Sequence, residues 1–151
     1  MDILIVFGSQ YGNTQRIAQA MATALRPDHR VRTMQAVVAA DVSADDVDLL
    51  IVGAPTQMRG TRILAAPFLD GLERRGFDGT SAAAFDTRVD LGPLLLSSQV
   101  IADRLVQAGC RLVASPQSFL VLGVEGPLAK GEEARAAAWA QSVTREVTIP
   151  V

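Results

Sequence analysis

The fold is decided by the stretch Gly8-Ser9-Gln10-Tyr11-Gly12-Asn13-Thr14, which follows an apolar run over residues 3–7. A pattern of apolar residues at helical spacing begins at Ile17, so the sequence predicts a strand, a tight turn and a helix. The first backbone N–H groups of such a helix have no internal partners, and the helix dipole places roughly half a positive charge beside them. This turn is therefore a candidate anion site, in which Ser9, Thr14 and backbone N–H groups hold a phosphate.

The turn differs from two familiar phosphate-binding loops. It lacks the Gly-Lys-Ser/Thr ending of a P-loop NTPase and the three-glycine spacing of a dinucleotide-binding fold. Nucleoside triphosphates and NAD are thus disfavoured as ligands of this loop. An interpretation without any ligand stays open, in which Gly12 makes a tight turn and Asn13 or Thr14 caps the helix.

Two later segments have the same form, an apolar strand that ends in polar residues. Residues 49–56, Leu-Leu-Ile-Val-Gly-Ala-Pro-Thr, are one, and residues 84–88, Ala-Phe-Asp-Thr-Arg, end the other. Because strands that alternate with helices form a parallel sheet, the ends of neighbouring strands meet at one edge. The loops 8–14, 54–62 and 86–92 are therefore expected to converge where ligands of such sheets bind.

Together these segments resemble flavodoxin-like FMN proteins. In that family a Ser/Thr-rich loop ending in Gly-Asn-Thr binds the FMN phosphate, a Pro-Thr loop lies along the flavin, and a third loop flanks its other side. The resemblance covers essentially the whole chain and is strongest with small bacterial flavodoxin-domain proteins that carry an aromatic residue before Gly-Asn-Thr, as Tyr11 is here. It implies that the cofactor is FMN and that the following residues bind it: Ser9, Gln10, Tyr11, Gly12, Asn13, Thr14, Pro55, Thr56, Gln57, Met58, Arg59, Gly60, Phe85, Asp86, Thr87, Arg88 and Leu91.

The implied fold is α/β, a flavodoxin-like three-layer sandwich with a five-stranded parallel sheet of order 2-1-3-4-5 and helices on both faces. We expect one such domain over residues 1–151. Residues 118–121 have the pattern of a further short strand, whose partner the sequence does not identify, and Trp139 is expected to face inward. Strands are expected near residues 3–7, 31–34, 49–52, 80–85 and 111–114, and helices near 14–25, 63–75, 94–108 and 132–146.

Composition limits the environment and the partners. The net charge of −2 offers no basic surface for nucleic acid. No apolar run approaches the roughly 20 residues of a membrane span, and the N-terminus lacks the pattern of a secretion signal. Cys110 is the only cysteine, which suits a reducing cytosol. We expect a soluble cytoplasmic monomer or weak dimer that meets a redox partner protein, either a reductase or an acceptor.

Other chemistries fit poorly. One cysteine and one histidine cannot supply a metal site at ordinary ligand spacing. A serine hydrolase needs Gly-x-Ser-x-Gly, whereas residues 8–12 place Ser9 one position early. A response-receiver domain shares the fold class but carries acids after the first strand and a phosphoacceptor Asp after the third. This chain has Gly8-Ser9 and Gly53-Ala54 at those places.

The leading hypothesis is an FMN protein that carries electrons, with the chemistry supplied by the cofactor. Two alternatives stay open: an NAD(P)H-dependent FMN quinone reductase, and a flavodoxin-like interaction domain that has lost FMN. Enzymatic activity is uncertain, and a carrier is favoured over a self-sufficient oxidoreductase. Individual roles are open as well. Tyr11 either flanks the phosphate or ribityl chain or points to solvent, and Asp86 either caps a turn or bonds the flavin edge.

The chain departs from flavodoxins proper around the expected flavin. That family usually stacks aromatic rings from the second and third loops, where this chain has Gln57-Met58-Arg59 and Arg88-Val89-Asp90-Leu91. Arg59, Arg62 and Arg88 lie in or beside these loops, and a nearby positive charge favours the fully reduced, anionic flavin. We therefore expect a higher potential for the second one-electron step than in acidic flavodoxins. The alternative is that these arginines point outward into solvent.

Overall fold

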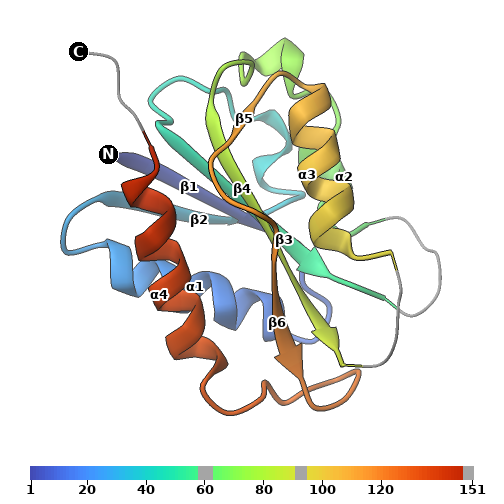
Figure 1. The fold of residues 1–151 in the computed structure, drawn as a ribbon. Helices are drawn as coiled ribbons and strands as arrows, with labels where there is room; N and C mark the ends of the chain where they lie inside the picture. Colours follow the sequence, from blue (N-terminus) through green and yellow to red (C-terminus); the bar gives the residue numbers. More distant parts are fainter. Residues whose placement is uncertain (58–62, 91–94, 148–151) are drawn as a thin grey trace.

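The computed structural model describes residues 1–57, 63–90 and 95–147 of the chain (Figure 1). Its centre is a parallel sheet in the order β2-β1-β3-β4-β5, and β6 also pairs with β4. The predicted order 2-1-3-4-5 is therefore confirmed. The strands are β1 (Asp2–Phe7), β2 (Arg30–Gln35), β3 (Leu49–Pro55), β4 (Ser81–Val89), β5 (Arg111–Leu112) and β6 (Gln117–Val121).

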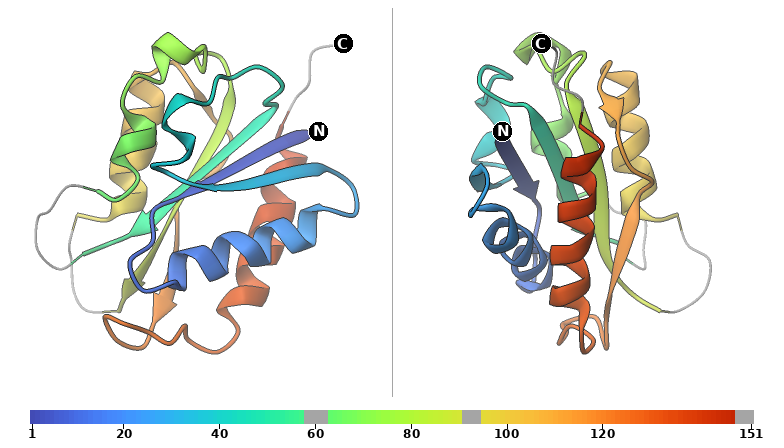
Figure 2. Two further views of the ribbon diagram at one scale, coloured as in Figure 1. Left: turned by 180° about the vertical axis from the view of Figure 1, so that it is seen from behind. Right: turned by 60° about the vertical axis from the view of Figure 1, so that its left-hand side comes forward.

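Helices cover both faces of the sheet (Figure 2). On one face α1 (Asn13–Leu25) packs against α4 (Glu132–Arg145). The other face carries α2 (Ala66–Leu69) and α3 (Ser97–Gln107), together with the 3-10 turns η1 (Ala39–Asp41) and η2 (Glu73–Arg75). Each face has its own apolar core, so the predicted three-layer sandwich is confirmed. Among the described residues no helix is long and apolar enough to cross a membrane.

The central strands are apolar on both faces because both faces are covered. Residues 49–54 of β3 are all buried, as expected for an inner strand of a parallel sheet. In contrast, β2 lies at the edge of the sheet and exposes Arg30 and Arg32. Charged side chains on an edge strand disfavour pairing with another chain.

The fourth strand is longer than predicted. It continues to Val89 because its second half, Phe85–Val89, pairs with Gln117–Val121 of β6. Its first half pairs with β5 through Ser81 and Ala82. Residues 118–121, for which the sequence identified no partner, therefore pair with β4 beyond the part of it that pairs with β5. As a correction to the predicted loop 86–92, its first four residues belong to the sheet.

The helix predicted over residues 63–75 is wrong. The four-residue α2 and the turn η2 stand there instead, separated by Gly71 at φ +78°. The Arg75 guanidinium lies back over this segment and donates hydrogen bonds to the carbonyl oxygens of Phe68 and Asp70. Because α2 ends early, these backbone carbonyl oxygens have no partner within the helix, and the Arg75 side chain takes that place. Local apolar spacing alone did not reveal this replacement.

The Phe85 ring fills space that Gly53 leaves open on the neighbouring strand. A Cβ atom at Gly53 would collide with the Phe85 ring, so only glycine permits this approach. The ring packs edge-on against Phe119 and Trp139, with centroids 6.0 and 6.3 Å away. Trp139 therefore packs inward from α4, as its helical spacing predicts.

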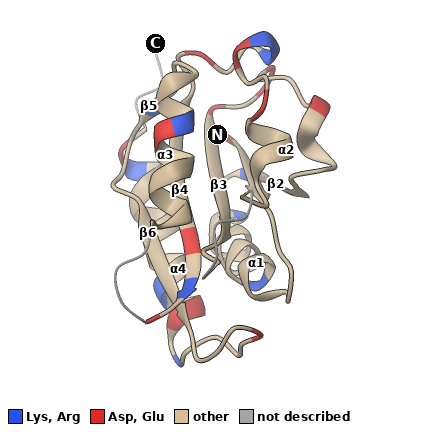
Figure 3. Cartoon of the chain, turned by 90° about the vertical axis from the view of Figure 1, so that its right-hand side faces the viewer, with Lys and Arg blue, Asp and Glu red and all other residues tan. Residues whose placement is uncertain are grey.

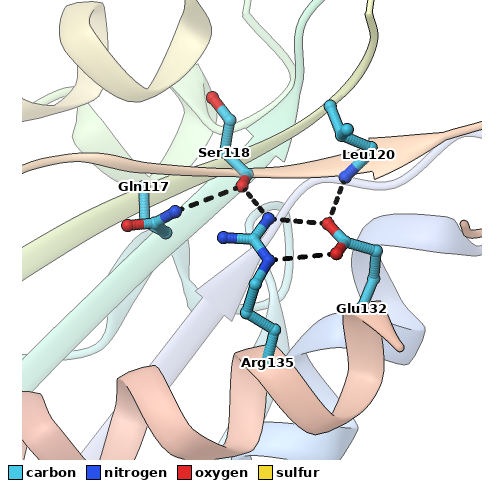
Figure 4. Close-up of polar contacts among 5 residues, drawn as sticks. All are labelled: Gln117, Ser118, Leu120, Glu132 and Arg135. Atoms are coloured by element: carbon cyan, nitrogen blue, oxygen red, sulfur yellow. Dashed lines mark hydrogen bonds and ion pairs between the residues drawn. The ribbon is translucent and has the colours of Figure 1, made fainter. Parts of the chain in front are cut away.

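An ion pair attaches β6 to α4 (Figure 4). The Glu132 carboxylate accepts hydrogen bonds from the Leu120 amide at 2.7 Å and from the Arg135 guanidinium at 2.6 and 3.0 Å. Arg135 also donates to the Ser118 carbonyl oxygen and lies 4.8 Å over the Phe119 ring. These contacts cover backbone groups at the outer edge of β6. The hydrogen bond from Arg135 holds the pKa of Glu132 below its usual value.

We predict that Glu132→Gln lowers the free energy of unfolding by about 1–3 kcal/mol at pH 7, since a charge-assisted hydrogen bond is lost. The pKa of Glu132 is lower in the folded chain than in the unfolded chain. Its stabilisation is therefore present above about pH 4.3 and is lost as pH falls through the folded pKa. Urea unfolding at pH 7 and pH 3 should show the difference between wild type and variant shrinking on acidification.

The neighbouring Glu133 provides a matched control. Its carboxylate pairs with Arg16 at 3.1 Å on the exposed surface, so Glu133→Gln should cost less than about 1 kcal/mol. Equal losses from the two substitutions, or a Glu132→Gln loss that does not change with pH, would contradict the proposed role of this ion pair.

Candidate functional site

A pocket of about 190 Å³ lies at the carboxyl edge of the sheet, lined by residues from all three predicted loops. The arrowheads of β3, β4 and β6 point toward this end of the molecule (Figure 1). Ser9, Gln10, Tyr11, Asn13 and Thr14 supply the first wall, and Pro55, Thr56 and Gln57 supply the second. Thr87, Arg88 and Val89 come from β4. The predicted convergence of these segments is confirmed.

The turn after β1 leaves the start of α1 open to a ligand. Gly12, at φ +88°, precedes the helix, and its amide donates to Ser9 Oγ at 3.0 Å. The helix has no side-chain cap and no acidic residue in its first turn. Its first N–H groups and its positive dipole end are therefore uncompensated. Ser9 Oγ accepts the Gly12 bond, so its own proton is available to donate.

Two buried threonine hydroxyls connect this turn to β4. Thr14 Oγ1 and Thr87 Oγ1 lie 2.8 Å apart, and the two residues are only 1% and 2% exposed. One hydroxyl donates to the other, which leaves one proton of the pair free for a further acceptor. Both residues also line the pocket, so that proton can serve a ligand there.

The second wall is attached to the start of α3. Thr56 Oγ1 accepts the Ser97 amide at 2.8 Å, and Ser97 Oγ donates to the Pro55 carbonyl oxygen at 3.0 Å. The helix begins at Ser97, three residues later than predicted, where these bonds satisfy its first backbone groups. At the pocket mouth Gln57 Nε2 donates to Gln10 Oε1 at 3.1 Å, which joins the first and second walls.

Asp86 caps α3 from beneath. It is fully buried, and its Oδ2 atom accepts the Ser98 amide at 3.0 Å. Of the two roles that the sequence left open, the structure therefore gives Asp86 a capping contact. Arg88 does line the pocket, with its side chain 25% exposed and its Nη1 atom 3.7 Å from Asp90 Oδ1. Its Nε atom is buried without a hydrogen-bond partner among the described residues.

Three predicted site residues lie outside the described pocket lining. Gly12 shapes the turn, Phe85 is in the core between the sheet and α4, and Asp86 is covered by α3. Four others, Met58, Arg59, Gly60 and Leu91, lie outside the described residues, and so does Arg62. Tyr11 lines the pocket and is 47% exposed, which fits both of the orientations predicted for it.

The predicted set omits four apolar residues of the pocket, Val89, Leu96, Val121 and Val124. Val121 ends β6, and Val124 follows in a turn that contains Gly126-Pro127. Such a Gly-Pro turn after a strand was a usable signal. Because the partner of residues 118–121 was unassigned, however, nothing in the local pattern indicated that this turn lies beside the other three loops.

Metal and thiol chemistry find no support among the residues that the structure describes. No group of three or more His, Cys, Asp or Glu side chains there could hold a metal ion. Cys110 is buried, and its thiol donates to the Phe77 carbonyl oxygen. Burial raises the pKa of Cys110 to about 11, so this thiol is protonated at neutral pH and is a poor nucleophile.

Comparisons with known proteins agree with the arrangement of the sheet and loops. Residues 4–71 match the family model for a flavodoxin domain. A search of curated proteins found no match. Among solved structures, oxidised flavodoxin 2 from Bacillus cereus is 24% identical with a TM-score of 0.81, covering 97% of this chain and 99% of that chain.

Two further solved structures show the same fold. Oxidised flavodoxin 1 from Bacillus cereus is 17% identical with a TM-score of 0.81, over 98% of this chain and 100% of that chain. A flavodoxin from the domain Archaea is 18% identical with a TM-score of 0.75, over 97% and 99%. The family model matches residues 4–71, and the solved structures share this arrangement over nearly the whole chain, so the chain has the flavodoxin-like fold.

Proposed function

We propose that this protein binds FMN in the pocket and acts as an electron-transfer carrier. The proposal rests on one observation: the pocket lining combines hydroxyl groups beside an uncapped helix N-terminus with a set of aliphatic side chains. FMN has a phosphate at one end and a largely apolar ring system at the other. The likeness to solved flavodoxins supports this choice of ligand.

The polar end fits a phosphate dianion. Ser9 Oγ and the Thr14–Thr87 hydroxyl pair supply donors, and the first amides of α1 add backbone donors without an acidic neighbour in that turn. Hydrogen bonds to a charged acceptor contribute about 1.5–3 kcal/mol each, roughly twice those to a neutral acceptor. The site therefore needs no lysine to prefer FMN over riboflavin.

The aliphatic part of the lining suits a flavin ring. It consists of Val89, Leu96, Val121 and Val124, and Pro55 joins them from β3. Bound FMN would supply the redox chemistry, since it accepts and gives up electrons one at a time. The role of the protein is to hold the ring, limit its contact with water and set its electrostatic surroundings.

Charge around the site is modest and mixed. Along the ribbon in Figure 3, positions of Lys and Arg alternate with positions of Asp and Glu. Arg88 is the cation in the described pocket lining, and Asp90 compensates it only in part at 3.7 Å. A positive charge beside the ring stabilises the more negative, fully reduced flavin, so Arg88 should raise the potential of the second electron step.

The first prediction for this site concerns the phosphate end. Thr14→Val keeps the shape of the side chain but removes its hydroxyl, so FMN affinity should fall about 10- to 100-fold. Riboflavin affinity should change little, because riboflavin has no phosphate, and Thr14→Ser should restore FMN binding. Fluorescence titration of apoprotein with both flavins measures these affinities. Equal wild-type affinity for FMN and riboflavin would disprove the phosphate assignment.

The second prediction separates a carrier from an enzyme. Holoprotein mixed with NADPH and a quinone should show no steady-state turnover until a separate flavoprotein reductase is added. Rapid NADPH oxidation by the protein alone would instead establish a quinone reductase. Apoprotein that binds no flavin would exclude both activities and leave an interaction domain.

The third prediction concerns Arg88. At about 7 Å and an effective dielectric near 20, one charge shifts a one-electron potential by on the order of 0.1 V. Partial exposure and the contact with Asp90 should reduce this to roughly 30 mV. Redox titration should therefore show a lower second potential in Arg88→Gln. Arg145→Gln, in the last turn of α4, is the control and should leave it unchanged. An unchanged potential in Arg88→Gln would mean that this charge does not act on the ring.

A further inference from the structure

The segment that follows β6 is a compact loop rather than an extended connection. We refer to residues 122–128 as the 122–128 loop. The Leu122 amide donates to the Pro127 carbonyl oxygen at 2.9 Å, and the Gly126 amide donates to the Gly123 carbonyl oxygen at 2.9 Å. An isolated bridge joins Val121 to Leu128 at its base. The loop is therefore held in one shape by its own backbone bonds.

The 122–128 loop is attached to the turn that precedes α1. Asn13 Nδ2 donates to the Glu125 carbonyl oxygen at 3.2 Å, although these residues are far apart in the sequence. A Cβ atom at Gly126, whose φ is +108°, would lie 2.8 Å from Asn13 Oδ1. A side chain at this position would therefore force either the loop or the Asn13 side chain to move and would disturb the contact between them. The Asn13 amide group is thus committed to the loop, whereas its backbone N–H stays at the helix end.

The loop also places apolar surface at the pocket. Val124 lines the pocket and yet is 62% exposed, so much of its side chain has no protein neighbour. Leu122 is 69% exposed on the same loop but is not part of the pocket lining. Tyr11 is the aromatic residue in the described lining, and the other apolar side chains there are aliphatic.

We infer that the 122–128 loop is the fourth wall of the flavin site, in which Val124 covers the ring and Asn13 positions the loop against the phosphate-binding turn. This inference rests on the proposed function, because it assigns a further ring contact to the same site. Val124 is a binding residue for the ring. Asn13 is a positioning residue that acts through the loop and not through the phosphate.

Titration of apoprotein with FMN and with riboflavin tests the role of Val124. Val124→Ala should weaken both flavins about 10-fold, because removing buried apolar surface affects the shared ring and not the phosphate. Leu122→Ala is the matched control on the same loop and should leave both flavin affinities within about twofold of wild type. A twofold change in affinity is smaller than the change expected from removing one buried methylene group. Unchanged affinities in Val124→Ala, or equal losses in the two variants, would overturn the assignment of Val124.

A second pair of variants tests the attachment to Asn13. Asn13→Ala and Gly126→Ala should both accelerate hydrogen exchange of the amides of residues 123–126 in the apoprotein and weaken both flavins. Gly79→Ala is the matched control, because Gly79 has a similar φ of +82° but a Cβ atom added there would meet no other atom within 4 Å. In the Gly79→Ala variant, amide hydrogen exchange in residues 123–126 and the affinities for both flavins should match those of the wild type.

The outcomes distinguish this inference from the proposed function. Wild-type protein that binds no flavin would disprove the proposed function and the fourth wall together. Wild-type binding with an Asn13→Ala loss confined to FMN would show that Asn13 serves the phosphate directly, which overturns its positioning role. Losses for both flavins, accompanied by faster exchange in the loop, are the expected result.

Discussion

The close approach of the chain at Gly8 is the constraint on which the site depends. Its amide donates to the Gly53 carbonyl oxygen at 3.0 Å, which keeps the turn beside β3 after β1 has ended. A Cβ atom at Gly8 would lie 2.5 Å from backbone and side-chain atoms of Leu64, so a larger residue would displace one of the two segments. This contact holds the beginning of the turn that leads into α1, on which Thr14 bonds Thr87 of β4.

The sequence was sufficient for the parts of the fold whose pattern is local. The apolar runs of β1 and β3 and the amphipathic α1 need no distant information, because strands covered on both faces must be apolar throughout. The pairing of β6 with β4 was not predictable in this way. It is favoured by contacts between residues far apart in the chain, in particular Glu132 and Arg135 at the outer edge of β6. Similarly, the early end of α2 involves Arg75, several residues downstream.

The candidate site shows the same limit. Residues at the carboxyl ends of β1, β3 and β4 or just beyond them could be assigned to one pocket because the strand order places those ends together. Asp86 could not be separated from its neighbours by pattern, since its burial under α3 depends on where that helix begins. Val124 was not predictable for the opposite reason. Its loop is informative in sequence, but its position follows only from the pairing of β6 and the contact with Asn13.

Affinity and potential are expected to depend on different parts of this pocket. The charged phosphate would interact with hydroxyls and amides around α1, where each charge-assisted bond contributes about 1.5–3 kcal/mol. A pair of stacked aromatic rings contributes about 0.5–1.5 kcal/mol beyond area burial, so replacing it with aliphatic contacts costs less than losing one phosphate bond. An aliphatic wall is thus compatible with tight binding if the phosphate end is intact. It also leaves Arg88 as the main charge in the described lining, so this side chain would act on the potential by raising the affinity for the reduced, anionic flavin, while the affinity for oxidised FMN would depend mainly on the phosphate contacts.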